Sequence, residues 1–312
     1  MVKGLERTKS VLAAALVALV AATPVLAQDD IKMDGGETGP QPVSAGAGAE
    51  WFPSTGRLGP FSASAGVNIV TSYFFRGYEQ EDSGGIFQPW MQLDLQIYSN
   101  DNGPLNGLAV YAGWWNSVHT EGNTAGGNSN WYETDIYCGA NLTFLDHWTL
   151  GAMFIDYEYP GLGSTAIREL DFSLSFDDSF VWEKLPLPNF AINPYALYAI
   201  EIQNSPGEIS NSYFETGIKP GFDIPISDNF AIGVSFPLFV GLSIDNYYGD
   251  DVFGYFNFGA NFSVPLAFIP KELGDWTFDA GVTGLYLNDQ VGLTDTGSSW
   301  ECYGTFGISM SY

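Results

Sequence analysis

Residues 298–312, SSWECYGTFGISMSY, alternate between two kinds of side chain. Counted backwards from Tyr312, every second residue as far as Trp300 is apolar or small, and most of the residues between them are polar or small. A period of two residues is that of a β-strand whose two faces meet different surroundings. The segment therefore predicts a two-faced strand. Because the pattern runs up to Tyr312, we expect this strand to close a sheet.

The same period recurs along most of the chain and predicts about twelve strands. In 86–98, for example, Phe87, Met91 and Leu93 alternate with Gln88, Gln92 and Asp94. The candidate strands are 61–77, 86–98, 104–117, 131–144, 147–159, 168–177, 190–202, 211–224, 229–245, 251–264, 274–287 and 299–312.

Length and composition favour a membrane barrel over a soluble β-sandwich, which also alternates. The candidate strands run to about ten to fifteen residues, whereas strands of soluble proteins average roughly 5–6. Charged residues make up 15% of the 312 residues and aromatic residues 16%, and the chain has 37 glycines. We therefore predict an all-β fold: a single antiparallel up-and-down transmembrane β-barrel of about 12 strands.

The connections support this prediction. Segments 99–104, 145–146 and 225–228 are short, whereas 78–85, 117–130 and 288–299 are longer and polar. Short turns at one end and long loops at the other are typical of outer-membrane barrels. Aromatic residues expected to form the two interfacial girdles are Phe144, Trp148, Phe230, Trp276 and Tyr312 at one end, and Trp114, Tyr132, Tyr286 and Trp300 at the other. Four prolines inside candidate strands, Pro89, Pro194, Pro220 and Pro237, require bulges or positions near a rim.

The N-terminal region predicts export. Residues 1–27 combine basic residues, an apolar core and a small-residue end at Ala27, as in a secretory signal peptide. Residues 28–60 are rich in Gly, Pro and Ala and predict a flexible periplasmic extension, which leaves 61–312 for the barrel. The predicted location is the bacterial outer membrane, with its lipids and its assembly machinery as partners.

Charge restricts the class of partner. The formal net charge is −26, and removal of the signal peptide, whose own charge is +2, makes it −28. Such a chain does not bind nucleic acid through bulk electrostatics, but it attracts cations. Small solutes or cations are the expected partners, and no cofactor or metal site is predicted.

Alternation also predicts which charged residues face the lumen, and acids dominate among them. The predicted pore-lining residues are Arg76, Asp94, Glu133, Asp135, Glu169, Asp171, Glu201, Glu215, Lys219, Asp223, Asp279 and Glu301. Ten acids against two bases predict a channel for passive diffusion of small hydrophilic solutes or ions that favours cations. The alternative is a non-conducting barrel with a structural or surface-interaction role, in which the acids only solvate the interior.

Catalytic and ligand sites are weaker hypotheses. Glu133 and Asp135 lie two residues apart, but carboxylate pairs are frequent in polar lumens. His119 and His147 lie in predicted connections, neither beside a serine of an alternating run, so we expect no enzyme. Trp90 and Trp115 are candidates to face inward, where their rings would stack on sugar solutes. The carboxylates of Asp245, Asp250 and Asp251 lack the spacing of an EF-hand. Cys138 and Cys302 lie on distant strands, and we expect no disulfide.

Four motifs resemble those of the TorF-type porins of bacterial outer membranes. They are SYFFRGYEQEDSGG (72–85), FQPWMQLDLQIY (87–98), YETDIYCGA (132–140) and YEYPG (157–161). The resemblance covers about residues 65–165. It implies an outer-membrane barrel in which an aromatic–Arg–Gly segment ends the first strand. It also implies that Tyr312 is an assembly signal read by the outer-membrane machinery.

Overall fold

A computed structural model describes residues 50–51, 59–121, 130–160, 167–203, 211–227, 230–289, 291 and 298–312. The expected signal peptide and nearly all of the expected extension lie outside the described residues. The short strand β1 (Glu50–Trp51) pairs with β5 through Glu50 and Ser99.

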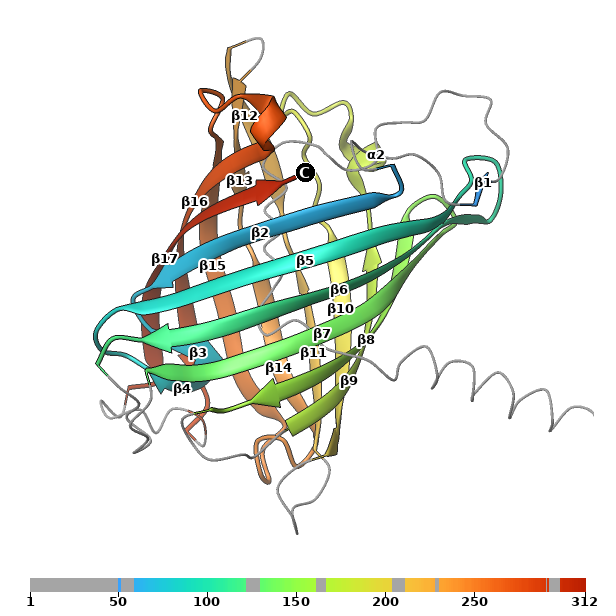
Figure 1. The fold of residues 1–312 in the computed structure, drawn as a ribbon. Coiled ribbons are helices and arrows are strands. Elements are labelled where there is room, and N and C mark those ends of the chain that lie inside the picture. The colour runs from blue at the N-terminus through green and yellow to red at the C-terminus, as the bar shows by residue number, and fades with distance from the viewer. Residues whose placement is uncertain are drawn as a thin grey trace, which may run out of the picture.

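Twelve antiparallel strands form a closed barrel, as the sequence predicted (Figure 1). Each strand pairs with the next along the chain, and the last pairs with the first. In chain order they are β2 (Phe61–Val70), β5 (Ile86–Ser99), β6 (Leu105–His119), β7 (Trp131–Phe144), β8 (Trp148–Glu158), β9 (Ile167–Phe176), β10 (Pro194–Gln203), β11 (Ser212–Ile218) continued by β12 (Gly221–Ser227), β13 (Phe230–Ser235) continued by β14 (Leu238–Asp245), β15 (Phe253–Pro265), β16 (Asp275–Leu287) and β17 (Trp300–Ser311).

The alternating C-terminal segment closes the barrel. Strand β17 pairs with β2 from Thr305 opposite Val70 to Ser311 opposite Ser64. The backbones of Tyr312 and Ala63 then exchange hydrogen bonds of 2.8 and 3.0 Å. The expected closing role of this segment is confirmed.

The prolines in the strands lie where the ladder is interrupted or begins. Pro220 separates β11 from β12, Pro237 separates β13 from β14, and Pro194 is the first residue of β10. The carbonyls of Pro220 and Pro237 still accept backbone hydrogen bonds of 2.8 and 3.0 Å. Pro89 lies within β5 opposite Val67. Two long wall strands are therefore each built from two shorter pieces.

The two ends of the barrel differ. At the end we call the turn end, the connections are short or fold into the small elements α2 (Ser179–Trp182) and η1 (Lys271–Leu273). Asp178 fixes the α2 connection, since its carboxylate accepts hydrogen bonds from Trp182 and from the backbones of Ile192 and Asn193. Burial opposes ionisation of Asp178, but these bonds outweigh it and lower its pKa below the ordinary value. We call the opposite end of the barrel, where β2 ends at Val70, the loop end.

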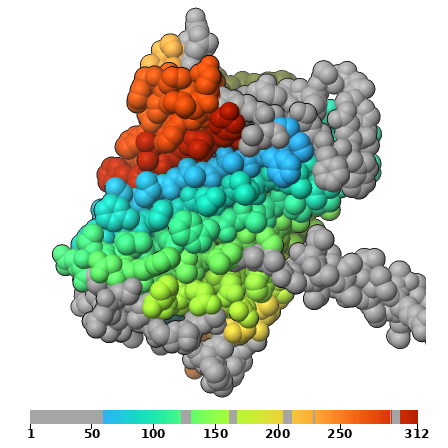
Figure 2. All heavy atoms as spheres, in the orientation of Figure 1, coloured from blue at the N-terminus to red at the C-terminus, as the bar shows by residue number. Residues whose placement is uncertain are grey.

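The outer surface is apolar along the strands. Leu93, Ile136, Val282 and Phe306 are each about half exposed, as lipid-facing side chains must be. Figure 2 shows the wall of β2, β5, β6 and β7 as a continuous surface. An apolar groove of about 600 Å³ lies over β6, β7 and β8 at Ala112, Cys138 and Ala152. Both cysteines are free. No helix in the described part of the chain is long and apolar enough to cross a membrane.

The prediction of one strand over 61–77 is wrong beyond Val70. Residues 73–81 leave the wall and form a hairpin of β3 (Tyr73–Phe75) and β4 (Tyr78–Glu81), which we call the lumen hairpin. The change of direction follows Thr71, whose backbone N–H and side-chain hydroxyl both bond to Gly304 of β17. Arg76 and Gly77, both with positive φ, form its two-residue turn.

Tyr132 was also expected on the outer girdle, but it is buried inside the barrel, 5% exposed. In the ladder of β6 with β7, Ser117 lies opposite Glu133, but the next residue, Val118, lies opposite Trp131. Tyr132 is therefore the extra residue of β7 at this point. Such a bulge breaks the alternation and turns a side chain to the other face. Trp131, 46% exposed, takes the outward position instead.

Burial along the inward faces shows where the lumen is filled. On β9, Glu169 and Asp171 are buried, Ser173 is half-buried and Ser175 is exposed. On β7, Glu133 and Asp135 are buried, whereas Asn141 and Thr143 are half-buried. On these two strands burial therefore decreases from the loop end, where the hairpin lies, towards the turn end, whereas Asn261 and Ser263 near the turn end of β15 remain buried.

The closed wall predicts opposite effects for two adjacent substitutions in β17. Phe306→Arg places a charge in hydrocarbon near the middle of the strand, which costs about 2–4 kcal/mol. Thr305→Arg, one residue away on the inward face, leaves the charge in the polar lumen. We expect a much lower urea-unfolding midpoint in lipid vesicles for Phe306→Arg alone. Equal midpoints for both variants would contradict the assigned faces.

Candidate functional site

The turn of the lumen hairpin has a backbone conformation that its first residue resists. Arg76 has φ +48° and Gly77 has φ +86°, so both central residues of the two-residue loop are left-handed. Hairpin turns of this kind favour Asn-Gly or Asp-Gly. An arginine there is strained, and strain of this sort persists where the surrounding contacts hold the residue in place.

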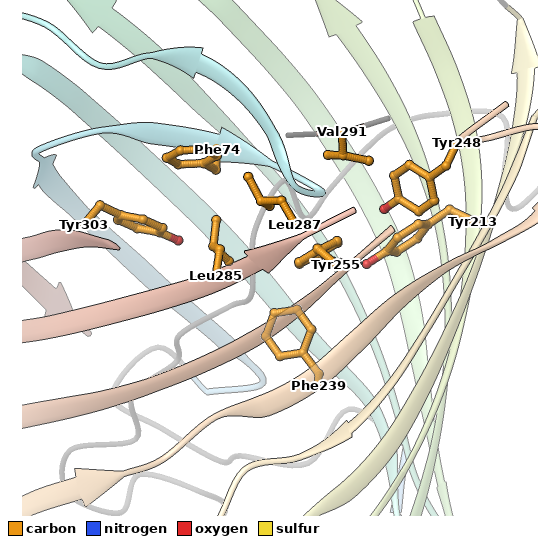
Figure 3. Close-up of a cluster of buried hydrophobic side chains, with 10 residues drawn as sticks. Phe74, Tyr213, Phe239, Tyr248, Tyr255, Leu285, Leu287, Val291 and Tyr303 are labelled. Carbon is orange, nitrogen blue, oxygen red and sulfur yellow. Dashed lines mark hydrogen bonds between the residues drawn. The ribbon is translucent and has the colours of Figure 1, made fainter. Parts of the chain in front are cut away.

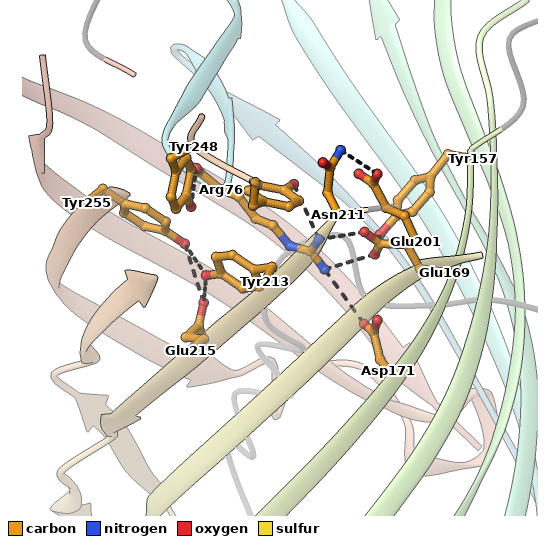
Figure 4. A network of polar contacts seen from close by, with 11 residues as sticks. Arg76, Tyr157, Glu169, Asp171, Glu201, Asn211, Tyr213, Glu215, Tyr248 and Tyr255 are labelled. Atoms are coloured by element: carbon orange, nitrogen blue, oxygen red, sulfur yellow. Dashed lines mark hydrogen bonds and ion pairs between the residues drawn. The ribbon is translucent and has the colours of Figure 1, made fainter. Parts of the chain in front are cut away.

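A carboxylate on the opposite wall holds Arg76. Its Nη1 and Nη2 donate to the two oxygens of Glu169 at 2.7 and 2.9 Å, and Nη2 lies 3.8 Å from Asp171 (Figure 4). All three residues are at most 8% exposed. Two parallel charge-assisted bonds fix both the distance and the plane of the guanidinium.

Aromatic rings complete the surroundings of the guanidinium. Its central carbon lies 4.3 Å from the ring centre of Tyr213, 5.0 Å from that of Phe75 and 5.4 Å from that of Tyr247. Tyr157 donates to Glu169 at 3.0 Å and so orients the carboxylate. These rings attract the cation electrostatically while they exclude water.

Tyrosine hydroxyls attach the rest of the hairpin to the wall and the loops. Tyr73 donates to Glu133 of β7 at 2.8 Å, and Tyr132 donates to Gln80 at 2.6 Å. Tyr248, beyond β14, donates to the carbonyl of Arg76 at 3.0 Å. The hairpin is therefore bonded on more than one side of the lumen.

An apolar cluster fills the space between the hairpin and β15–β17 (Figure 3). Phe74 stacks on Tyr303 with ring centres 5.8 Å apart, and Leu285 and Leu287 lie beside them. Gly77 touches this cluster, because a Cβ there would lie 3.0 Å from Val291. The tight fit and the positive φ together explain why glycine occupies the second turn position.

The structure brings five of the sequence-predicted residues together around the hairpin: Arg76, Glu133, Asp135, Glu169 and Asp171. Both oxygens of Asp135 and both of Asp171 accept no hydrogen bond from any described residue, although each side chain is 1% exposed. Among the described residues, Arg76 is the base that forms ion pairs with this group. The cluster is therefore strongly acidic.

The other predicted residues lie along the wall, and two of them border this group. Glu201 lies opposite Glu169 in the ladder of β9 and β10, and Glu215 bonds to Tyr213, whose ring contacts the guanidinium of Arg76 (Figure 4). Glu215 accepts hydrogen bonds from Tyr195 and Tyr213, and Glu201 accepts one from Asn211. Asp223 accepts from Asn189, Asp94 from Gln92, and Asp279 from Ser263 and Ser309. Lys219 lies 4.9 Å from the ring centre of Tyr195, and Glu301 is half-buried on β17. No group of three described His, Cys, Asp or Glu residues is arranged to hold a metal ion.

One serine–histidine contact differs from the sequence-based expectation. His119, the last residue of β6, has its Nε2 2.9 Å from the hydroxyl of Ser117 and its Nδ1 3.6 Å from Glu81. The three side chains are at most 2% exposed, and His119 stacks on Tyr132. These residues are buried, and His119 faces Glu81 at the end of β4, so they support the lumen hairpin.

Loss of the Arg76 clamp should loosen the hairpin and leave the barrel intact. Arg76→Ala removes two buried charge-assisted bonds and leaves Glu169 uncompensated, which favours release of the hairpin into water. We expect faster amide hydrogen exchange at 73–81 with unchanged exchange in β16 and β17. The control is Arg168→Ala, which removes a half-exposed ion pair of 3.1 Å to Asp156. Slow exchange at 73–81 in Arg76→Ala would show that the clamp does not hold the hairpin.

No protein-family model and no curated protein matches the sequence. Solved structures with partial similarity include the β domain of the Bordetella autotransporter BrkA, at 12% identity over 80% of this chain and 98% of that chain, with a TM-score of 0.43. An outer membrane channel from Pseudomonas putida F1 is 8% identical over 81% of this chain and 94% of that chain, with a TM-score of 0.44. The porin NanC is 11% identical over 80% and 98%, with a TM-score of 0.34.

These values are too low to carry an argument about function. The architecture itself is informative, because a closed wall with an apolar exterior leaves no unpaired strand edge in hydrocarbon. This chain is a closed β-barrel of twelve strands, like those of bacterial outer-membrane proteins.

Proposed function

We propose that the protein is an outer-membrane channel for passive diffusion of small hydrophilic solutes or ions, and that it favours cations. In the conformation described here the lumen hairpin closes the channel near the loop end. Conduction then requires the hairpin to move from its site on β7 and β9. The proposal assigns no catalytic role to any residue.

The acidic cluster beneath the hairpin carries this proposal. Glu133 and Asp135 on β7 and Glu169 and Asp171 on β9 are buried in the lumen, and Arg76 forms ion pairs with Glu169 and Asp171. Rings of acidic side chains select cations in channels. When the hairpin leaves with its arginine, the wall retains all four acids, and its attraction for cations increases.

The lower burial of β7 and β9 towards the turn end supports a channel over a filled barrel. Small or polar inward residues such as Asn141, Ser173 and Ser175 leave space on the side of the cluster that faces the turn end. By the convention of outer-membrane barrels this end faces the periplasm. A solute entering from there meets the hairpin and the acids together.

The alternative is a non-conducting barrel with a structural or surface-interaction role. The observation that favours it is the hairpin itself, which is bonded to more than one wall strand and packed against an apolar cluster. The two functions differ in whether the hairpin leaves the lumen. A conductance measurement on the purified protein separates them.

Further proposals follow from the sequence. The motifs near the hairpin support membership of the TorF-type porins, because the aromatic–Arg–Gly segment of that resemblance is the hairpin turn. A signal peptide over 1–27 and recognition of Tyr312 by the outer-membrane assembly machinery also belong to this proposal. The signal peptide is tested by recovering the mature protein from the outer-membrane fraction and showing that it begins near Gln28.

Neutralising the cluster should reduce cation preference. The variant Glu133→Gln, Asp135→Asn, Asp171→Asn removes three lumen charges. We expect its reversal potential in a planar bilayer under a KCl gradient to move towards zero relative to the native protein. The preference of the native protein should weaken towards 1 M salt, where the Debye length is about 3 Å.

A matched control removes the same charge from exposed positions: Asp101→Asn, Glu121→Gln, Asp250→Asn. Its reversal potential should equal that of the native protein. Anion preference in the native protein would refute the charge argument. Absence of conductance both in the native protein and in a variant with 73–81 replaced by a short Gly-Ser linker would favour the structural barrel.

A further inference from the structure

The wall around Arg76 has the composition of a binding site for a planar organic cation. We propose that Glu169, Asp171, Tyr157, Tyr213 and Tyr247, the guanidinium cradle, bind the guanidinium group of a solute, and that Arg76 is an internal ligand that occupies this site in the closed state. The inference rests on the proposed channel function and names the class of solute that the channel takes.

The cradle recognises shape as well as charge. Glu169 accepts two parallel bonds of 2.7 and 2.9 Å, which match the fork of a guanidinium and not a spherical ion such as Na⁺. The central carbon of the guanidinium lies over the ring of Tyr213, 4.3 Å from its centre. The hydroxyl of Tyr247 accepts from Nη1 at 3.3 Å. A planar, delocalised cation satisfies all of these contacts together.

An unused acceptor points to a ligand beyond the tethered arginine. Asp171 is 1% exposed, its oxygens accept no hydrogen bond from any described residue, and its distance of 3.8 Å to Nη2 is too long for a bond. A buried carboxylate without a donor is costly. A free guanidinium is not held by the hairpin backbone, so it can shift to bond Glu169 and Asp171 at once.

The cradle belongs to the wall and its loops, whereas the guanidinium belongs to the hairpin. Glu169 and Asp171 lie on β9, Tyr157 on β8 and Tyr213 on β11, and Tyr247 follows β14. Of the three described rings that contact the guanidinium, Phe75 is the one that leaves with the hairpin. The vacated site therefore keeps its acids and two of its three rings.

Tethering explains why this site stays closed to dilute solutes. A ligand on a short connection has an effective concentration in the range of millimolar or above, so a free competitor must reach a similar concentration to displace it. A solute with a guanidinium group would then both occupy the channel and favour hairpin release. Removal of Arg76 should expose the site at much lower solute concentration.

The test measures binding of guanidinium chloride to purified, folded Arg76→Ala by isothermal titration calorimetry, with NaCl holding ionic strength constant. We expect saturable binding that is absent in the native protein over the same range. Urea, which is planar and of similar size but uncharged, should not bind. Arg76→Ala with Glu169→Gln should bind about tenfold to a hundredfold more weakly, as expected for the loss of a charged acceptor.

A second measurement uses the native chain and does not depend on the folding of a variant. Guanidinium at concentrations below those that unfold the barrel should speed amide exchange at 73–81, while β16 and β17 stay unchanged and equal NaCl has no effect. Equal responses to guanidinium, urea and NaCl in both experiments would overturn the proposed site.

The outcomes for site and channel are separable. Saturable guanidinium binding without conductance in any variant would support the cradle and reject the channel. Conductance of Arg76→Ala that guanidinium does not block, together with no calorimetric binding, would reject the cradle and leave the channel standing. Block of that current by guanidinium, removed by Glu169→Gln, would support both.

Discussion

Hydrocarbon offers no hydrogen-bond partner to a peptide group, and each unpaired group costs several kcal/mol there. A sheet in a membrane must therefore close, and here closure depends on β17 meeting β2 in register. The side-chain period of two residues fixes that register, because a slip by one residue would turn Phe306 and Ile308 into the lumen and Ser309 into lipid. Everything inside the barrel is positioned by this ladder. The breaks at Pro220 and Pro237 are tolerated because neighbouring backbone groups still use the proline carbonyls.

Within that wall, one cation links the lumen hairpin to the buried acids. Four buried acids on β7 and β9 would repel one another in a dry interior, and Arg76 compensates part of that charge while it carries the hairpin into place. Removing one partner of a buried ion pair destabilises a protein far more than losing an exposed pair. The contrast between Arg76 with Glu169 and Arg168 with Asp156 therefore follows from burial, since both pairs have short contacts.

Alternation predicted the wall because lipid on one side and a polar lumen on the other impose the pattern along every strand. It failed after Val70 because Thr71, Tyr73 and Phe75 continue the same period although the chain has left the sheet. Two signals were present: Phe74 occupies a position where alternation requires a polar residue, and Arg76–Gly77 follows as a two-residue turn. Tyr132 was placed on the wrong face because a bulge adds one residue without leaving a mark in the composition. The pair of Arg76 and Glu169, 93 residues apart, has no signature in a single sequence.

The hairpin and the barrel differ in how their stability is built. Wall strands share ladders with two neighbours, and each can separate only if the whole barrel opens. The hairpin has one internal ladder of three residue pairs and is joined to the wall through side chains. Units with few shared backbone bonds open first in folded proteins. The strain of a left-handed arginine lowers the cost of that opening further, because release allows Arg76 to leave the unfavourable region. A ligand of the proposed cradle would keep the wall acids paired while the strained turn relaxes, so the contacts that hold the hairpin would then favour its release.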